Sequence, residues 1–144
     1  MIKTVNSFLL TLSQFVLIVA IAWFCGVLGN PVSLGIMVAG ILLGAWSLIT
    51  FKFNVNIFPD VRKNQKLILV GPYRLIRHPM YSAVLMITLA WVLNRIDVLS
   101  ITLWIALLVI LNLKIRYEES QLIEKFPKYK EYIQRSKKLI PFVF

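Results

Sequence analysis

The sequence predicts an all-α integral membrane protein, a helical bundle of four transmembrane helices with a cytoplasmic loop and a C-terminal helical segment. Of its 144 residues 59% are hydrophobic and the mean hydropathy is +0.79, whereas soluble domains average about half apolar residues. Long uncharged runs separate the charged segments, as in membrane-spanning helices. The basic residues, which give a formal net charge of +10, flank these runs.

The first third of the chain predicts a transmembrane hairpin. One span is expected at about residues 8–28 and a second at about 32–51, joined by the turn Gly29-Asn30-Pro31. So short a connection predicts antiparallel neighbours. Gly40 and Gly44 lie four residues apart on one helical face, which predicts a close helix contact. The partner is either another helix of the chain or a second copy, so the oligomeric state stays open.

A basic stretch, residues 52–78, leads to a third span at about 80–94. Pro79 stands where this helix would begin, and proline suits the first turn of a helix because its missing N–H is not needed there. The span is shorter than the ~20 residues that a helix perpendicular to the membrane needs. We therefore expect the preceding residues to lie at headgroup depth, or the membrane to be thinner there.

The fourth span is expected at about residues 98–115. No helix breaker precedes Pro127, so one helix is expected to leave the bilayer and continue to Phe126. Apolar and aromatic residues at three- and four-residue spacing in 129–133 predict a short amphipathic helix in the tail.

Loop charges predict the orientation. The 52–78 stretch and the tail, residues 128–144, are both strongly basic, whereas the opposite turns carry only Arg95 as a basic residue. By the positive-inside rule, both stretches and both termini are cytoplasmic. The third and fourth spans then bring His78 and the Glu118-Glu119 pair together on the cytoplasmic side.

The basic charge does not indicate nucleic acid, because it flanks apolar runs and is explained by anionic lipid headgroups. Membrane lipids are the expected partners. The single cysteine, Cys25, lies inside the first apolar run and excludes a disulfide within the chain. With one histidine and one cysteine, no metal site is expected.

The most concentrated polar motif is Gly71-Pro72-Tyr73-Arg74-Leu75-Ile76-Arg77-His78-Pro79-Met80-Tyr81. It holds the chain's one histidine with two prolines, two tyrosines and two arginines. Taken singly, these residues are explained as interfacial anchors or structural hydrogen-bonding groups. Their concentration ahead of a short span favours half of a cofactor site at the membrane face.

Glu118 and Glu119 are the candidates for the other half. Their alternative explanation is a solvated helix surface that balances nearby basic residues. Consecutive helical residues point about 100° apart, so both cannot face solvent equally on a packed helix. The chain has only six acidic residues, and two at a membrane boundary need partners. Such a carboxylate can accept both hydroxyls of a ribose or pair with Arg74 or Arg77.

The sequence shows no glycine-rich phosphate loop, no paired Cys/His pattern and no Ser-His-Asp candidate. Its chemistry is therefore expected to come from a cofactor, with the protein supplying binding and orientation.

Both motifs resemble the signature of the isoprenylcysteine carboxyl methyltransferase and phospholipid methyltransferase superfamily. The first reads Gly71-Pro72-Tyr73-Arg74-x-x-Arg77-His78-Pro79-x-Tyr81, and the second Glu118-Glu119-x-x-Leu122-x-x-x-Phe126-x-x-Tyr129-x-x-Tyr132, then Ile140-Pro141-Phe142. The resemblance covers about residues 67–142. Ala83 stands where the family often has glycine; because alanine is small, close helix approach is still expected.

The resemblance implies a membrane methyltransferase that uses S-adenosylmethionine (SAM) at a cytoplasmic site. The length of the chain predicts one domain, 1–144, with a hairpin over 1–51 and a cofactor-binding catalytic half over 52–144. The cofactor-binding residues that the resemblance implies are Tyr73, Arg77, His78, Tyr81, Glu118 and Glu119. The candidate catalytic residues are His78, Arg77 and Glu119, with His78 or Glu119 as the base for an amine acceptor.

The expected acceptor is a lipophilic small molecule or prenylated substrate, with isoprenylcysteine carboxylate first and a phospholipid, small amine or thiol as alternatives. Its pocket is expected to involve the first hairpin and Trp91 or Trp104. Two other functions stay open: an NADPH-dependent enzyme resembling sterol reductases, and a non-catalytic membrane scaffold.

Overall fold

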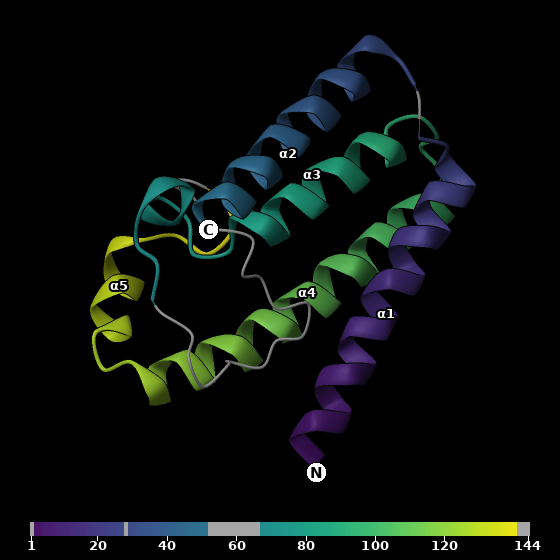
Figure 1. Cartoon of the computed structure of the whole chain (residues 1–144). Coiled ribbons are helices and arrows are strands. Elements are labelled where there is room, and N and C mark those ends of the chain that lie inside the picture. Colours follow the sequence, from purple (N-terminus) through teal and green to yellow (C-terminus); the bar gives the residue numbers. More distant parts are fainter. Residues whose placement is uncertain (1, 28, 52–66, 141–144) are drawn as a thin grey trace.

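The fold is seen in a computed structural model, which describes residues 2–27, 29–51 and 67–140 (Figure 1). Its elements are α1 (Ile2–Cys25), α2 (Pro31–Thr50), the 3₁₀ turn η1 (Gly71–Arg74), α3 (Pro79–Val92), α4 (Val98–Lys125) and α5 (Tyr129–Arg135). All named elements in these ranges are helical, which confirms the all-α prediction. Most of the predicted cytoplasmic loop, residues 52–66, and the Pro141-Phe142 part of the tail motif lie outside the described residues.

Three of these helices are long and apolar enough to cross a membrane: Ser7–Cys25, Pro31–Thr50 and Val98–Lys125. They confirm the prediction of an integral membrane protein. The helix α3 is apolar but has 14 residues, so a fourth span remains a prediction. As predicted, α4 runs without a break to the residue before Phe126.

Local signals in the sequence define where these helices begin and end. Asn30 caps α2 by accepting a hydrogen bond from the Ser33 N–H at 3.0 Å, and Asp97 caps α4 by accepting from the Ser100 N–H at 2.8 Å. The helix α1 ends at Cys25, and the next residue, Gly26, has a φ of 74°, in the left-handed region that glycine tolerates. The first span therefore ends earlier than the predicted residue 28.

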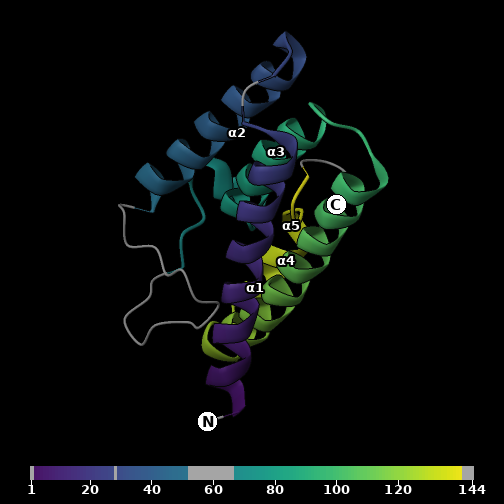
Figure 2. The ribbon, with the colours of Figure 1, turned by 90° about the vertical axis from the view of Figure 1, so that its right-hand side faces the viewer.

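The helices pair as α2 with α3 and α1 with α4, and α3 also contacts α1 and α4 (Figures 1 and 2). Although the turn at 29–30 is short, α1 and α2 diverge from it and share at most a marginal contact. The predicted hairpin of consecutive spans is therefore not accompanied by close packing of α1 against α2. The physical reason lies in the small-residue face of α2, which is turned toward α3.

Gly40 and Gly44 form that face. A Cβ added at Gly40 would lie 2.9 Å from Ile87 Cγ1 and 3.2 Å from the carbonyl oxygen of Ala83, both on α3, whereas one at Gly44 would lie 3.4 Å from Ala83 Cβ. Close approach of two helices in lipid requires such small residues. The two glycines thus lie in a contact within the chain, in which Gly40 has no room for a side chain whereas a Cβ at 44 would make an ordinary contact with Ala83.

A buried apolar cluster connects α1, α3, α4 and the tail. Its members are Ile21, Cys25, Leu85, Val92, Leu107, Leu111, Ile115 and Leu139. Cys25 is therefore a packing residue. Because Leu139 belongs to this cluster, the segment after α5 is held against the helices close to the candidate site.

We predict that Gly40→Ala lowers the midpoint of thermal unfolding in detergent, because its Cβ must displace Ile87 and the Ala83 carbonyl. Gly44→Ala is the matched control, since its Cβ makes an ordinary contact with Ala83. Both changes gain about 1 kcal/mol of helix propensity, so the difference between them reports the packing. Equal midpoints would contradict the assignment of Gly40 to the α2–α3 contact.

Candidate active site

The first motif begins with a tight turn against the end of α2. Gly71 has φ 62°, and a Cβ there would lie 2.7 Å from Thr50 Oγ1, so glycine is required by both conformation and space. Pro72 then starts η1, and its carbonyl accepts hydrogen bonds from the N–H groups of Leu75 and Ile76, both at 3.1 Å. The turn places Tyr73 in the interior, 8% exposed.

The tail pairs with the motif through its backbone. Ile76 and Lys137 form an isolated parallel β-bridge. The N–H of Arg77 donates to the Lys137 carbonyl at 2.8 Å, and that of His78 to the Lys138 carbonyl at 3.1 Å. This pairing fixes the backbone of Arg77 and His78, and it joins segments too far apart in the sequence to be predicted from it.

The side chains of Arg77 and His78 both contact the Glu119 carboxylate. Arg77 Nε donates to Glu119 Oε1 at 2.7 Å, and His78 Nε2 lies 3.1 Å from the same oxygen. All three side chains are largely buried, and charge-assisted hydrogen bonds of this kind are stronger than neutral ones. The start of α3 and the end of α4 therefore meet, as the loop charges predicted.

Arg77 also clamps the tail. Its Nη1 donates to the carbonyls of Ile133 at 3.2 Å and Ser136 at 2.5 Å. With the bond to Glu119, these contacts connect α3, α4 and the end of α5 through one guanidinium group. Much of the donor capacity of Arg77 is thus already used within the protein.

Glu118 is held more weakly than its neighbour. Tyr81 donates its hydroxyl to Glu118 Oε2 at 3.3 Å, and His78 Nδ1 lies 3.7 Å from that oxygen. The rings of His78 and Tyr81 are stacked with centroids 5.7 Å apart. The imidazole consequently lies between the two carboxylates, with one nitrogen toward each.

A small hollow of about 40 Å³ opens beside Glu118. Its walls combine aromatic, charged and apolar side chains: Phe51, Leu67, Ile68, Tyr73, Arg77, His78, Glu118, Leu122, Tyr129 and Tyr132. Glu118 lines this hollow and Glu119 does not. Of the two acids, Glu118 is thus the one that lines the hollow, and Glu119 the one that is bound by Arg77 and His78.

The tyrosines of the hollow remain neutral phenols at physiological pH. Burial raises the pKa of Tyr73 and of Tyr129 well above the usual value, and raises the pKa of Tyr132 to about 12. Tyr132 donates its hydroxyl to the Tyr73 carbonyl, and Tyr129 packs edge-on against Tyr132 with ring centroids 5.5 Å apart. They give the hollow aromatic faces without adding charge.

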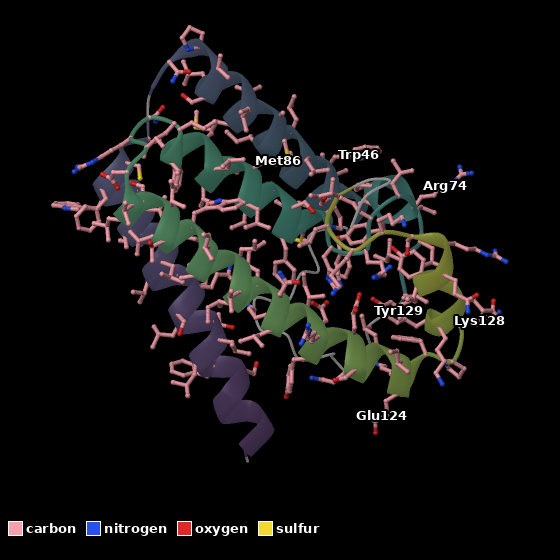
Figure 3. The ribbon with its side chains drawn as sticks, turned by 180° about the vertical axis from the view of Figure 1, so that it is seen from behind. Trp46, Arg74, Met86, Glu124, Lys128 and Tyr129 are labelled. Carbon is pink, nitrogen blue, oxygen red and sulfur yellow. The ribbon has the colours of Figure 1, made fainter. Side chains whose placement is uncertain are left out.

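The structure brings together five of the six predicted cofactor residues, Arg77, His78, Tyr81, Glu118 and Glu119, and places Tyr73 in the wall. Arg74 is exposed and points away from this cluster, as do Glu124 and Lys128, whereas Tyr129 points inward (Figure 3). The option that Arg74 pairs with the acids is therefore wrong, because η1 turns its side chain outward. Sequence reasoning missed Tyr129 and Tyr132 as site residues, although their spacing was noted.

We predict that Glu119→Gln destabilises the protein more than Glu118→Gln. The amide keeps a single acceptor oxygen where two donors converge, and a hydrogen bond to a charged group contributes about 1.5–3 kcal/mol. Glu118→Gln removes only longer contacts and serves as the matched control. Thermal unfolding in detergent measures both, and a larger loss for Glu118→Gln would contradict the division of roles.

Comparison with known proteins gives one family match. The family model for phospholipid methyltransferase matches residues 28–129, more than half of the 144 residues. The match starts earlier than the resemblance at 67–142, includes α2, and contains both the Gly71–Tyr81 motif and the Glu118-Glu119 pair. No curated protein gave a significant match. The chain belongs to the phospholipid methyltransferase family.

Proposed function

We propose that this membrane methyltransferase transfers a methyl group from SAM to a lipophilic acceptor at the cytoplasmic membrane face, with an isoprenylcysteine carboxylate as the first candidate. The observation that carries the proposal is the hollow whose lining combines a partly buried, weakly bonded carboxylate, Glu118, with neutral aromatic rings. Family membership supports methyl transfer. The donor and the acceptor are our inference.

The residue types of the hollow suit a sulfonium cation. Aromatic faces attract cations, and Tyr73, Tyr129 and Tyr132 line the same hollow as Glu118. Small-molecule pockets span about 300–1,000 Å³, so a hollow of about 40 Å³ must widen for a cofactor of this size. The charged and aromatic groups of the hollow fit SAM, but the hollow is too small for it, so its walls must move apart for SAM to bind.

Bound SAM would supply an activated methyl group, so the protein needs no covalent nucleophile. Its task is to hold donor and acceptor at reacting distance and to exclude water. A carboxylate acceptor arrives already deprotonated, whereas an amine acceptor must lose a proton. For an amine, His78 is the base that we favour, because Glu119 is already committed to Arg77 and His78.

A large apolar groove lies on the other side of the first motif. It has a volume of about 830 Å³ and is formed by α2, α3, α4 and the tail; its lining is Leu43, Trp46, Pro72, Leu75, Ile76, Ser82, Leu85, Met86, Leu89, Trp104, Leu108, Asn112, Leu139 and Ile140. Figure 3 shows Trp46 and Met86 on neighbouring helices at this groove. Of the two tryptophans predicted for an acceptor pocket, Trp104 lines it and Trp91 does not.

The groove and the hollow share one wall. Pro72 and Ile76 line the groove, while Tyr73 and Arg77, the next residues along the chain, line the hollow. A hydrocarbon chain lying in the groove would bring its polar head close to this wall. We therefore assign the groove to the apolar part of the acceptor.

We predict that the purified protein in detergent binds SAM by calorimetry and methylates a prenylated cysteine analogue or a lipid amine in a radiolabelled transfer screen. Glu118→Gln should weaken SAM binding roughly tenfold, because it removes the charge that faces the cation. Binding of NADPH without SAM would support the reductase alternative. Binding of neither would support the scaffold.

We also predict that Leu89→Trp raises the KM for the prenylated analogue roughly tenfold and leaves the Kd for SAM unchanged, because the new ring occupies the groove. Val109→Trp is the matched control, since Val109 is exposed on α4 outside the groove. A change in SAM affinity with an unchanged KM would count against the assignment of the groove.

A further inference from the structure

Lys114 is a buried cation whose role the site described so far does not explain. It lies on α4, is 1% exposed, and donates from Nζ to Gln14 Oε1 on α1 at 2.6 Å. The same ammonium lies 5.6 Å from the centroid of the Tyr81 ring on α3. An ionisable residue within a membrane bundle is unfavourable unless partnered, and it commonly marks a functional site.

Its partner comes from a helix outside the family match. The helix α1 ends before residue 28, where that match begins, yet it buries a polar stripe of Ser7, Thr11 and Gln14. The Thr11 hydroxyl donates a hydrogen bond to the Ser7 carbonyl within α1, whereas the Gln14 side chain accepts one from Lys114 on α4. We conclude that α1 supports the ammonium group as well as anchoring the chain.

Lys114 is linked to Glu118, which lines the hollow, by charge and through Tyr81. It lies one turn before Glu118 on α4, and the opposite charges of the two attract each other. Tyr81 connects them, because its ring lies beside the Lys114 ammonium while its hydroxyl donates to Glu118. Because the one direct hydrogen bond to Glu118 among the described residues is long, at 3.3 Å, we expect the position of its carboxylate to depend on Lys114 and Tyr81.

We propose that Lys114, held by Gln14 of α1, is a positioning residue that orients Tyr81 toward Glu118 and places a positive charge one helical turn from the Glu118 carboxylate. The part that concerns the cofactor rests on the proposed function. The titratable groups that act on Glu118 are His78, Tyr81, Lys114, Glu119, Tyr73 and Tyr129. Burial raises the pKa of Glu118 most strongly and the charge of Glu119 raises it further, whereas His78, the hydrogen bond from Tyr81 and the charge of Lys114 lower it. Loss of Lys114 therefore favours proton uptake by Glu118.

A ligand-free experiment tests the pairing. Thermal unfolding in detergent is measured for the parent, Lys114→Met, Glu118→Gln and the double variant. We expect Lys114→Met to lower the midpoint less in the Glu118→Gln background than in the parent, because the lysine there has lost its counter-charge. Additive losses would overturn the proposal. If Lys114→Met does not fold, Gln14→Leu replaces it in the same cycle.

Ligand binding tests the consequence for the site. SAM carries a methyl group and a sulfonium charge that its product, S-adenosylhomocysteine, lacks. If Lys114→Met acts through charge, it should weaken the binding of SAM at least about fivefold more than the binding of S-adenosylhomocysteine. As pH falls, Lys114→Met should lose SAM binding at a higher pH than the parent, while Lys114→Arg follows the parent. Equal weakening for both ligands would indicate a packing role and overturn the proposal. If the parent binds neither ligand, the proposed function fails and the ligand-free cycle alone decides the role of Lys114.

Discussion

The site depends on the carboxylate oxygen of Glu119 that Arg77 and His78 share. Buried charges destabilise a protein unless they are paired and hydrogen-bonded, so this oxygen fixes where the start of α3 lies relative to the end of α4. Because Arg77 also holds the carbonyls that follow α5, the tail takes its position from the same interaction. The pairing thus converts separate helices into the walls of one hollow.

Hydropathy and helix-start signals predicted the helices well, because both act locally. Pro79 is expected at the start of the third helix, and the structure begins α3 at that residue; the caps at Asn30 and Asp97 appear only in the structure. The sequence does not, however, identify which helix packs against a face of small residues. Gly40 and Gly44 show that α2 can be approached closely, but sequence spacing does not say by which helix. The short turn suggested α1, whereas the steric fit with Ala83 and Ile87 favours α3.

The meeting of the two motifs could be predicted, because loop charges place both at the same end of a helical pair. The orientation of individual side chains could not. Arg74 and Arg77 look equivalent in the sequence, yet η1 turns one outward and the tail binds the other. The contacts of Gln14 with Lys114 and of Arg77 with Ser136 join residues far apart in the chain, where no local pattern reveals them.

Adjacent acids on one helix take different roles for a geometric reason. Because consecutive side chains point about 100° apart, a helix that commits Glu119 to Arg77 and His78 directs Glu118 elsewhere, here into the hollow. The first motif divides its residues in the same way, with apolar side chains toward the groove and polar ones toward the hollow. The charged methyl donor and the lipophilic acceptor that we propose would need such opposite surroundings within reach of each other. The Gly71–Tyr81 segment provides both, because it separates the apolar groove from the polar hollow. Different residues in it line one or the other, which explains why so many residue types occur in so short a motif.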